Sequence, residues 1–224
     1  MIIVCILLMA GFFLQFYRDP EREIPQQEGI IVSPADGKVM EIGTVKGGEI
    51  PLVEKNGKKN PLPELDGYIE TEMTMVVIFM NPFDVHVNRA PISGTIKKIT
   101  HVPGEFMSAS TPVYATNERN VSVIEGEERV VVIQVAGMFV RRIRFFKHEG
   151  DFVERGERIG MIVFGSQVVT IFPKKYGVVV SEGDKVYAGE TILASVQIPL
   201  CIFITTPLPH NLLIVSQHVY GIQL

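Results

Sequence analysis

The segments "HEGDFVERGERIG" (148–160) and "SEGDKVYAGETIL" (181–193) are two copies of one repeat, and they decide the fold that this sequence predicts. They share Glu, Gly, Asp, Val, Gly, Glu and Ile in the same order, at a constant offset of 33 residues. Each copy predicts a Gly-Asp turn, a short strand, a glycine turn and a further strand. Looser copies occur at 34–50 and 92–106.

Half-motifs of this kind, known as hammerheads, pair with one another because neither half can bury a core alone. They predict a mainly β protein, a compact β-sandwich of the barrel-sandwich-hybrid type. Short runs rich in Val, Ile, Phe and Thr, separated by Gly, Pro, Asn and Asp, continue this pattern from residue 30 onward. We interpret Asp151 and Asp184 as turn residues rather than catalytic acids, because tight Gly-Asp turns need positive φ.

The composition of the 224 residues excludes several classes of protein. A hydrophobic content of 46% is enough for a sizeable core, and a net charge of -4 argues against a general nucleic-acid binder. Cys5 and Cys201 lie far apart in apolar runs and predict no disulfide framework. The five histidines are scattered, without helical metal-ligand spacing or a nearby cysteine, so no metal site is predicted.

Both ends of the chain are apolar. Residues 1–17 contain no charged side chain, which predicts an N-terminal apolar helix that anchors the protein in the cell membrane, with a buried helix as the alternative. Arg18 and Arg22 follow it and favour a main domain on the cytoplasmic side. Residues 195–224 are apolar but interrupted by prolines, and we expect a tail on the domain or at the membrane surface. The segment 46–66 predicts an exposed hairpin or loop.

Several polar residues stand where a plain β-sandwich would not need them. In the strand-like run "VVIFMNPFDVHVNRAPISG" (76–94), Asp84, His86 and Asn88 would share one face, since side chains alternate along a strand. A lone histidine in a strand is more often structural than catalytic. A functional role for His86 is favoured by further polar residues near the starts of other predicted strands.

These further residues are Asp36 in "SPADGKV" (33–39) and Asn117 and Arg119 in "YATNERNVSVI" (114–124). Taken alone, Asp36 is typical of a turn and the "TNERN" segment of a polar loop.

Gly165 and Ser166 interrupt the apolar run "IGMIVFGSQVVTIFP" (159–173), where a lone glycine predicts a β-bulge. The surroundings lack the G-x-S-x-G elbow of a serine hydrolase. Another use of the serine is self-cleavage, in which its hydroxyl attacks the preceding carbonyl with help from a base such as histidine. Elimination and loss of ammonia would then leave a pyruvoyl group, a carbonyl that serves as an electron sink for a bound amine.

Five motifs together resemble the short, single-anchor phosphatidylserine decarboxylases and the related archaetidylserine decarboxylases. They are "FYRDPEREIP", "VSPADGKV", "FMNPFDVHVNRAPISGTI", "TNERN" and "GERIGMIVFGSQVVTIFP", in this order between Phe16 and Leu193. The resemblance implies a decarboxylase domain at 18–194 and cleavage between Gly165 and Ser166. The products would be a β chain of residues 1–165 and an α chain of residues 166–224, which stay associated, with a homo-oligomer of this pair left open.

The resemblance also implies roles for single residues. Ser166 would become the pyruvoyl group and form a Schiff base with the amine of a serine phospholipid, yielding carbon dioxide and an ethanolamine phospholipid. Asp36 matches the aspartate of the self-cleavage triad, and His86 the histidine of the decarboxylation step. The substrate contacts expected on this basis come from Asn88, Arg89, Asn117 and Arg119, with the two arginines on the phosphodiester.

Two positions depart from the family pattern. Arg89 stands where longer members carry a second histidine as the self-cleavage base, so either His86 serves both steps or Arg89 and Asp36 promote the acyl shift electrostatically. Gln167 stands where many short members have a basic residue. A non-enzymatic binding or adaptor protein at the membrane is the alternative function, but no lysine has the methionine neighbours of a carrier, and no long helical hairpin separates the repeats.

Overall fold

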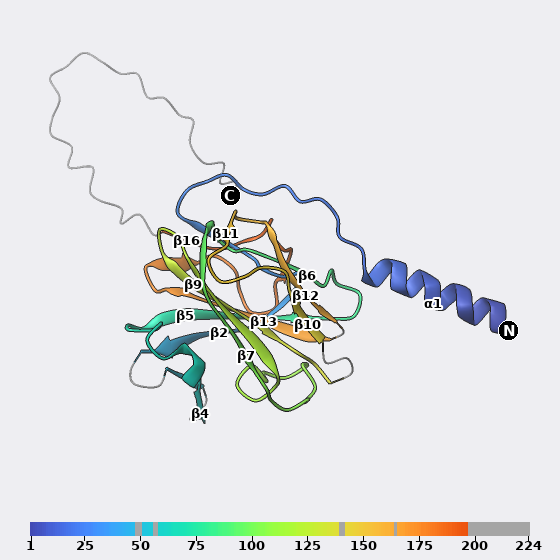
Figure 1. The fold of residues 1–224 in the computed structure, drawn as a ribbon, viewed down its shortest axis with the longest axis horizontal. Coiled ribbons are helices and arrows are strands. Elements are labelled where there is room, and N and C mark those ends of the chain that lie inside the picture. Colours follow the sequence, from blue (N-terminus) through green and yellow to red (C-terminus); the bar gives the residue numbers. More distant parts are fainter. Residues whose placement is uncertain (48–50, 56–57, 139–141, 164, 197–224) are drawn as a thin grey trace, which may run out of the picture.

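The computed structural model describes residues 1–47, 51–55, 58–138, 142–163 and 165–196. The described chain is mainly β, with one α-helix at the N-terminus and one short 3-10 helix, which confirms the predicted fold class (Figure 1). The helices are α1 (Ile2–Phe16) and η1 (Pro63–Leu65). The strands are β1 (Ile30–Val32), β2 (Gly37–Lys46), β3 (Leu52–Lys55), β4 (Lys58–Pro61), β5 (Met73–Met80), β6 (Val87–Arg89), β7 (Gly94–Val102), β8 (Arg119–Glu125), β9 (Arg129–Val135), β10 (Arg142–Phe145), β11 (Phe152–Val153), β12 (Arg158–Val163), β13 (Ser166–Pro173), β14 (Tyr176–Val178), β15 (Lys185–Val186) and β16 (Ile192–Val196).

Three sheets make up the described β structure. The largest has ten strands in the order β11-β7-β8-β9-β13-β5-β2-β3-β4, with β15 also paired to β2. The two smaller sheets have three strands each, in the orders β1-β16-β14 and β10-β12-β6. Every pairing between named strands is antiparallel.

The two copies of the repeat fold in the same way. In the first copy the amide of His148 donates to the carboxylate of Asp151 at 2.8 Å, and in the second the amide of Ser181 donates to Asp184 at 2.8 Å. The glycine before each aspartate has a positive φ, +95° and +102°. Both aspartates therefore close turns, as predicted.

The looser copies of the repeat supply the partner strands. β11 pairs with β7 through Val153 and Gly94, and β15 pairs with β2 through Val186 and Gly37. Each strong copy is thus joined to a loose copy by an equivalent short antiparallel pairing. This arrangement is the one that paired hammerhead halves predict.

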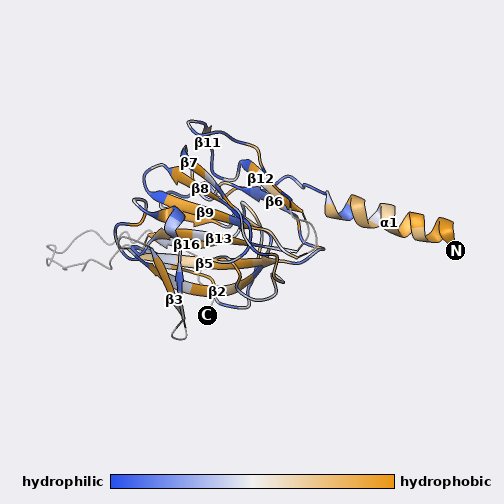
Figure 2. Cartoon of the chain, turned by 60° about the horizontal axis from the view of Figure 1, so that its bottom comes forward, coloured by the Kyte–Doolittle hydropathy of each residue, from blue (hydrophilic) through white to orange (hydrophobic). Residues whose placement is uncertain are grey.

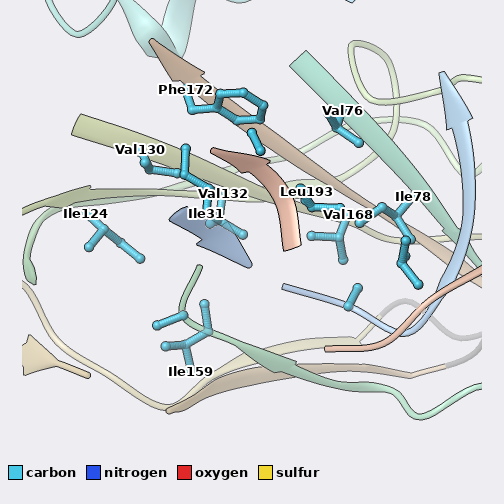
Figure 3. Close-up of a cluster of buried hydrophobic side chains, with 14 of the residues drawn as sticks. Ile31, Val76, Ile78, Ile124, Val130, Val132, Ile159, Val168, Phe172 and Leu193 are labelled. Carbon is cyan, nitrogen blue, oxygen red and sulfur yellow. The ribbon is translucent and has the colours of Figure 1, made fainter. Parts of the chain in front are cut away.

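Both faces of the ten-stranded sheet are buried, because alternate residues of its central strands enter two separate cores. On β13, Val168 and Phe172 pack into the first core, which also holds Ile31 of β1 and Leu193 of β16 (Figure 3). The first core therefore lies between the large sheet and the smaller sheets. Residues on the opposite face, including Ile171 of β13, pack into the second core.

The segment 46–66 forms the predicted hairpin from β3 and β4, followed by η1. It is less exposed than predicted, because Val53, Leu62 and Leu65 are buried and belong to the second core. The hairpin therefore covers part of one face of the large sheet. Of the predicted tail, 197–224 lie outside the described residues.

The predicted N-terminal helix is present as α1, which extends away from the β domain (Figure 1). Its apolar side chains are largely exposed, and the helix is orange along most of its length in Figure 2. Phe16, its last residue, is instead fully buried. Within the described part of the chain, no helix combines the length and the apolar character that a membrane crossing requires.

Candidate active site

Gly165 and Ser166 lie where the chain passes from one sheet to another. β12 belongs to the three-stranded sheet with β6 and β10, and β13 begins at Ser166 between β5 and β9 of the large sheet. The pairing of β13 with β5 is regular from Ser166, opposite Met80, onward. The predicted β-bulge is therefore wrong, because the glycine marks a crossing between sheets and no extra residue is inserted into the ladder.

Gly165 has the left-handed conformation, with φ of +48°. A Cβ added at this glycine would meet no heavy atom within 4 Å. The backbone angle, rather than lack of space, therefore favours glycine at this position.

The side chain of Ser166 is fully buried on the first-core face of β13. Its only described partner is the sulfur of Met80, at 3.4 Å from Oγ, which is a weak acceptor. The hydroxyl is thus held in place without a strong hydrogen bond that an attack on a carbonyl would have to break.

A chain of buried amides fixes the side chain of Asn88 beside Ser166. Asn88 Oδ1 accepts a hydrogen bond from Nε2 of Gln134 at 2.8 Å, and Gln134 Oε1 accepts one from Asn120 at 3.4 Å. The amide nitrogen of Asn88 therefore points the other way, to the same Met80 sulfur, at 3.7 Å. Asn88 was expected from the sequence, whereas Gln134 and Asn120 were missed, because only the strand register shows that they face it.

His86 is fully buried and has one uncommitted nitrogen. Its Nδ1 lies 2.9 Å from the backbone carbonyl of Asp84, which can only accept, so Nδ1 carries the proton in the neutral ring. Nε2 is left with a lone pair and has no hydrogen-bond partner among the described residues. The ring packs against that of Phe16 with 4.3 Å between centroids and an angle of 35° between the ring planes. This geometry is that of a base shielded from water.

Burial lowers the pKa of His86 below the 6.5 of an exposed histidine, and the nearby Asp84 only partly offsets this. The ring is therefore neutral at neutral pH and able to accept a proton at Nε2.

The predicted strand through Asp84 and His86 is wrong. β5 ends at Met80, a turn follows in which the carboxylate of Asp84 accepts from Asn81, and β6 begins only at Val87. The Asp84 carboxylate also binds Lys185. It is the backbone of Asp84, and not its side chain, that orients His86.

Asp36 is buried and bound to Arg22 rather than to a histidine. Both of its carboxylate oxygens accept from Nη2 of Arg22 at 2.9 Å, and the amide of Ala188 donates to Oδ1 at 2.8 Å. Arg22 also pairs with Glu190 at 3.1 Å. Sequence reasoning missed Arg22 as a partner, since the two residues belong to different segments with no pattern that links them.

Arg89 is also held by the segment that follows α1. Its guanidinium donates to the carboxylate of Asp19 at 3.0 Å and to the carbonyls of Gly156 and Pro20. Asp19 pairs with Arg158 as well. Burial lowers the pKa of Arg89, and the neighbouring Asp19 carboxylate partly offsets this.

Asn117, Arg119 and Gln167 lie on the second-core side of the large sheet, away from the Ser166 side chain. Arg119 donates to the buried carboxylate of Glu64 at 2.6 Å. Asn117 joins the backbone of Met107 to that of Ala136. Gln167 is fully buried, and its side chain binds the backbone of the 109–113 loop. The structure thus brings together Ser166, Asn88 and Met80. It commits Asn117, Arg119 and Gln167 to structural contacts elsewhere.

The low pKa of His86 leads to a prediction about stability. The unfolded chain binds a proton at a higher pH than the folded chain, so the free energy of unfolding falls as the pH drops from 6.5 toward the folded-state pKa. We expect the urea midpoint of His86→Gln to fall less than that of the unsubstituted protein between about pH 7 and about pH 5. His101→Gln, at an exposed position, is the control and should keep the full pH dependence. Equal slopes for all three proteins would contradict the prediction.

Comparison with known proteins finds sequences related to this chain. A family model described as phosphatidylserine decarboxylase matches residues 9–194. A relative in Methanocaldococcus jannaschii, named as an archaetidylserine decarboxylase proenzyme, is 45% identical over 195 residues, 86% of this chain and 93% of that protein. The phosphatidylserine decarboxylase proenzyme of Azorhizobium caulinodans is 45% identical over 181 residues, 80% of this chain and 71% of that protein. That of Desulfotalea psychrophila is 39% identical over 193 residues, 85% of this chain and 82% of that protein. The matched span contains every candidate residue described above.

Proposed function

Because this chain belongs to the phosphatidylserine decarboxylase family, we propose that it is a proenzyme that cleaves its own Gly165–Ser166 bond and then decarboxylates a serine phospholipid. The family makes the chain a carboxy-lyase. The observation that carries the proposed cleavage is the buried, weakly bonded hydroxyl of Ser166 directly after a glycine in the left-handed conformation.

The cleavage proposed here uses only groups of the chain and water. Ser166 Oγ attacks the carbonyl carbon of Gly165, the bond from that carbon to the nitrogen of residue 166 breaks, and an ester forms. Loss of the Cα proton of residue 166 then breaks its Cβ–Oγ bond, and Gly165 leaves as a carboxylate. A proton then adds to Cβ, which becomes a methyl group, and water replaces the nitrogen on residue 166, which departs as ammonia and leaves a carbonyl.

Two side chains on the first-core face support this sequence. His86 has the free Nε2 that the hydroxyl proton requires, and its backbone carbonyl accepts from the amide of Ile162 at 3.2 Å, three residues before Gly165. The amide nitrogen of Asn88 is oriented toward Met80, next to the Ser166 hydroxyl, where a donor would stabilise the oxyanion that forms at the Gly165 carbonyl.

Position 166 suits a pyruvoyl group. Among the described residues, the hydroxyl that would be lost has only a thioether as its hydrogen-bond partner, so the methyl group that would remain at Cβ leaves no strong hydrogen bond unmade. Once linked to the amine of the substrate, a pyruvoyl group supplies the electron sink for loss of carbon dioxide. His86 would hold the proton that the substrate carbon receives, and Phe16 would exclude water from its ring.

The sheet explains how two chains would remain together after cleavage. β13, which would begin the new α chain, pairs with β5 on one side and β9 on the other, and both belong to the β chain. β15 and β16 also pair with β2 and β1. Cleavage would therefore free one peptide end without separating the strands.

We also propose that α1 attaches the protein to the cell membrane. Its exposed apolar side chains have no cover among the described residues, and the segment after it contacts the candidate site through Asp19 and Arg22. An amphiphilic substrate could then pass from the bilayer to the site.

The direct test is the state of the purified unsubstituted protein. We expect two chains of about 18 and about 6.5 kDa, in proportion to the 24.9 kDa of the whole, with no free amine at the N-terminus of the smaller one. The same sample should release carbon dioxide from phosphatidylserine or archaetidylserine, supplied in parallel. An intact chain that decarboxylates neither lipid would refute the proposal.

A further inference from the structure

Arg142 and Arg144 differ from the other arginines that the structure describes. Every other described arginine donates to a carboxylate or to a backbone carbonyl. The side chains of Arg142 and Arg144 form neither an ion pair nor a hydrogen bond with the described residues. Two uncommitted guanidinium groups on one short strand are therefore available to an anion from outside the protein.

Both side chains enter one small pocket. The two arginines are alternate residues of β10 and share its outer face, opposite Val163 and Met161 of β12. These four residues and Tyr17 line a pocket of about 170 Å³, and no acidic side chain is among them. The pocket has room for a phosphate group but not for a whole lipid.

The pocket lies close to the bond proposed to be cleaved. Val163, directly opposite Arg142, precedes Ser166 by three residues, a span of at most about 11 Å even for a fully extended chain. In a serine phospholipid only three bonds along the headgroup separate the phosphate oxygen from the amine. A phosphate on these arginines would thus keep the amine within reach of position 166.

The wall of the pocket is also suited to an amphiphile. Tyr17 directly follows α1, whose exposed apolar side chains lead away from the pocket, and Met161 and Val163 are apolar. Arg89 and Arg119, the arginines that the sequence suggested for phosphate binding, are instead neutralised by Asp19 and Glu64.

We propose that Arg142 and Arg144 bind the phosphodiester of the serine phospholipid and so position its headgroup, an inference that rests on the proposed function. The two planar guanidinium groups can each donate two hydrogen bonds to the phosphate oxygens. They act in binding and take no part in the cleavage of the chain.

The test is the double variant Arg142→Gln/Arg144→Gln, assayed with short-chain phosphatidylserine dispersed as monomers. We expect KM to rise about tenfold or more with kcat changed less than about twofold, because hydrogen bonds to a charged group are lost equally from the ground and transition states. Cleavage into two chains should be complete. The matched control is Lys97→Gln/Lys98→Gln, which removes the same charge from exposed positions on β7 and should keep the original KM.

Two further measurements separate the possible failures. The same monomeric lipid is titrated into Ser166→Ala protein, which is expected not to cleave, so that binding is measured even if the proposed chemistry is wrong. Adding the two arginine substitutions to this protein should weaken lipid binding about tenfold. Binding to vesicles of anionic phosphatidylglycerol reports contact with the membrane surface. If the double variant loses only vesicle binding, or if KM and the titration are unchanged, the proposed phosphate site is refuted.

Discussion

Replacing Ser166 by alanine is expected to leave the protein as a single chain of 24.9 kDa with no measurable decarboxylase activity. The substitution removes the hydroxyl that is proposed to attack the Gly165 carbonyl, so neither the new chain end nor the pyruvoyl group would form. The fold should survive, because the only hydrogen bond of Ser166 Oγ among the described residues is the weak one to the sulfur of Met80. Denaturing gels, the intact mass and carbon dioxide release measure the three outcomes.

The matched control for this variant is Ser122→Ala. Ser122 is also buried in the large sheet, on β8, and its hydroxyl donates to the carbonyl of Val132 at 3.2 Å. It should cleave normally despite losing a stronger hydrogen bond than the one at Ser166. Two chains from Ser166→Ala protein, or activity in the uncleaved form, would show that the reactive residue lies elsewhere.

The fold could be predicted from the sequence because its information is local and repeated. Gly-Asp turns depend on backbone angles that few residues adopt, so two copies of "EGD" are enough to predict two equivalent turns, which Asp151 and Asp184 form. Short apolar runs rich in Val, Ile, Phe and Thr likewise predict strands such as β13. What local pattern does not show is which sheet a strand joins, and for that reason a crossing at Gly165 was mistaken for a bulge.

The candidate site was predicted only in part, because its polar residues are paired by contacts between distant segments. Asp36, Arg89 and Arg119 are buried, and each has a partner of opposite charge, in Arg22, Asp19 and Glu64. A sequence shows which residues carry charge but not which charges neutralise each other. The pairing matters energetically because these charges are buried, and breaking a buried ion pair typically costs about 3–5 kcal/mol.

These ion pairs also give the segment between α1 and β1 a structural role. Asp19 binds Arg89, and Arg22 binds Asp36, so this segment covers two of the three residues expected to act with Ser166. Ile24 packs against Gly156 and Gly189, at the equivalent turns of the two repeats, where a Cβ on either glycine would lie within 3 Å of it. The segment therefore closes the site by contacts with both halves of the fold.

His86 is left as the strongest candidate for the group that transfers the proton in both steps. Arg89 stands in the position of the second histidine of the family pattern, and its guanidinium is bound to Asp19. The other histidines that the structure describes, His101 and His148, are exposed. We therefore expect His86→Gln to slow cleavage of the chain and also to lower kcat for the fraction that is cleaved, by about 10² to 10⁴ in each case.

The two effects can be measured separately on one preparation. Cleavage is followed by gel from the start of synthesis, and kcat is expressed per mole of cleaved chain, so that slow maturation does not lower the apparent rate. Phe16→Leu is the companion variant, because it keeps Nε2 but removes the ring that shields it. It should cleave and raise the pKa of His86 toward 6.5, which would shift the limb of the pH–rate profile that reports His86 to higher pH. Normal cleavage in His86→Gln with a large loss of kcat would instead assign the self-cleavage base to another group, and Asp36, which is bound to Arg22, would then be the residue to test.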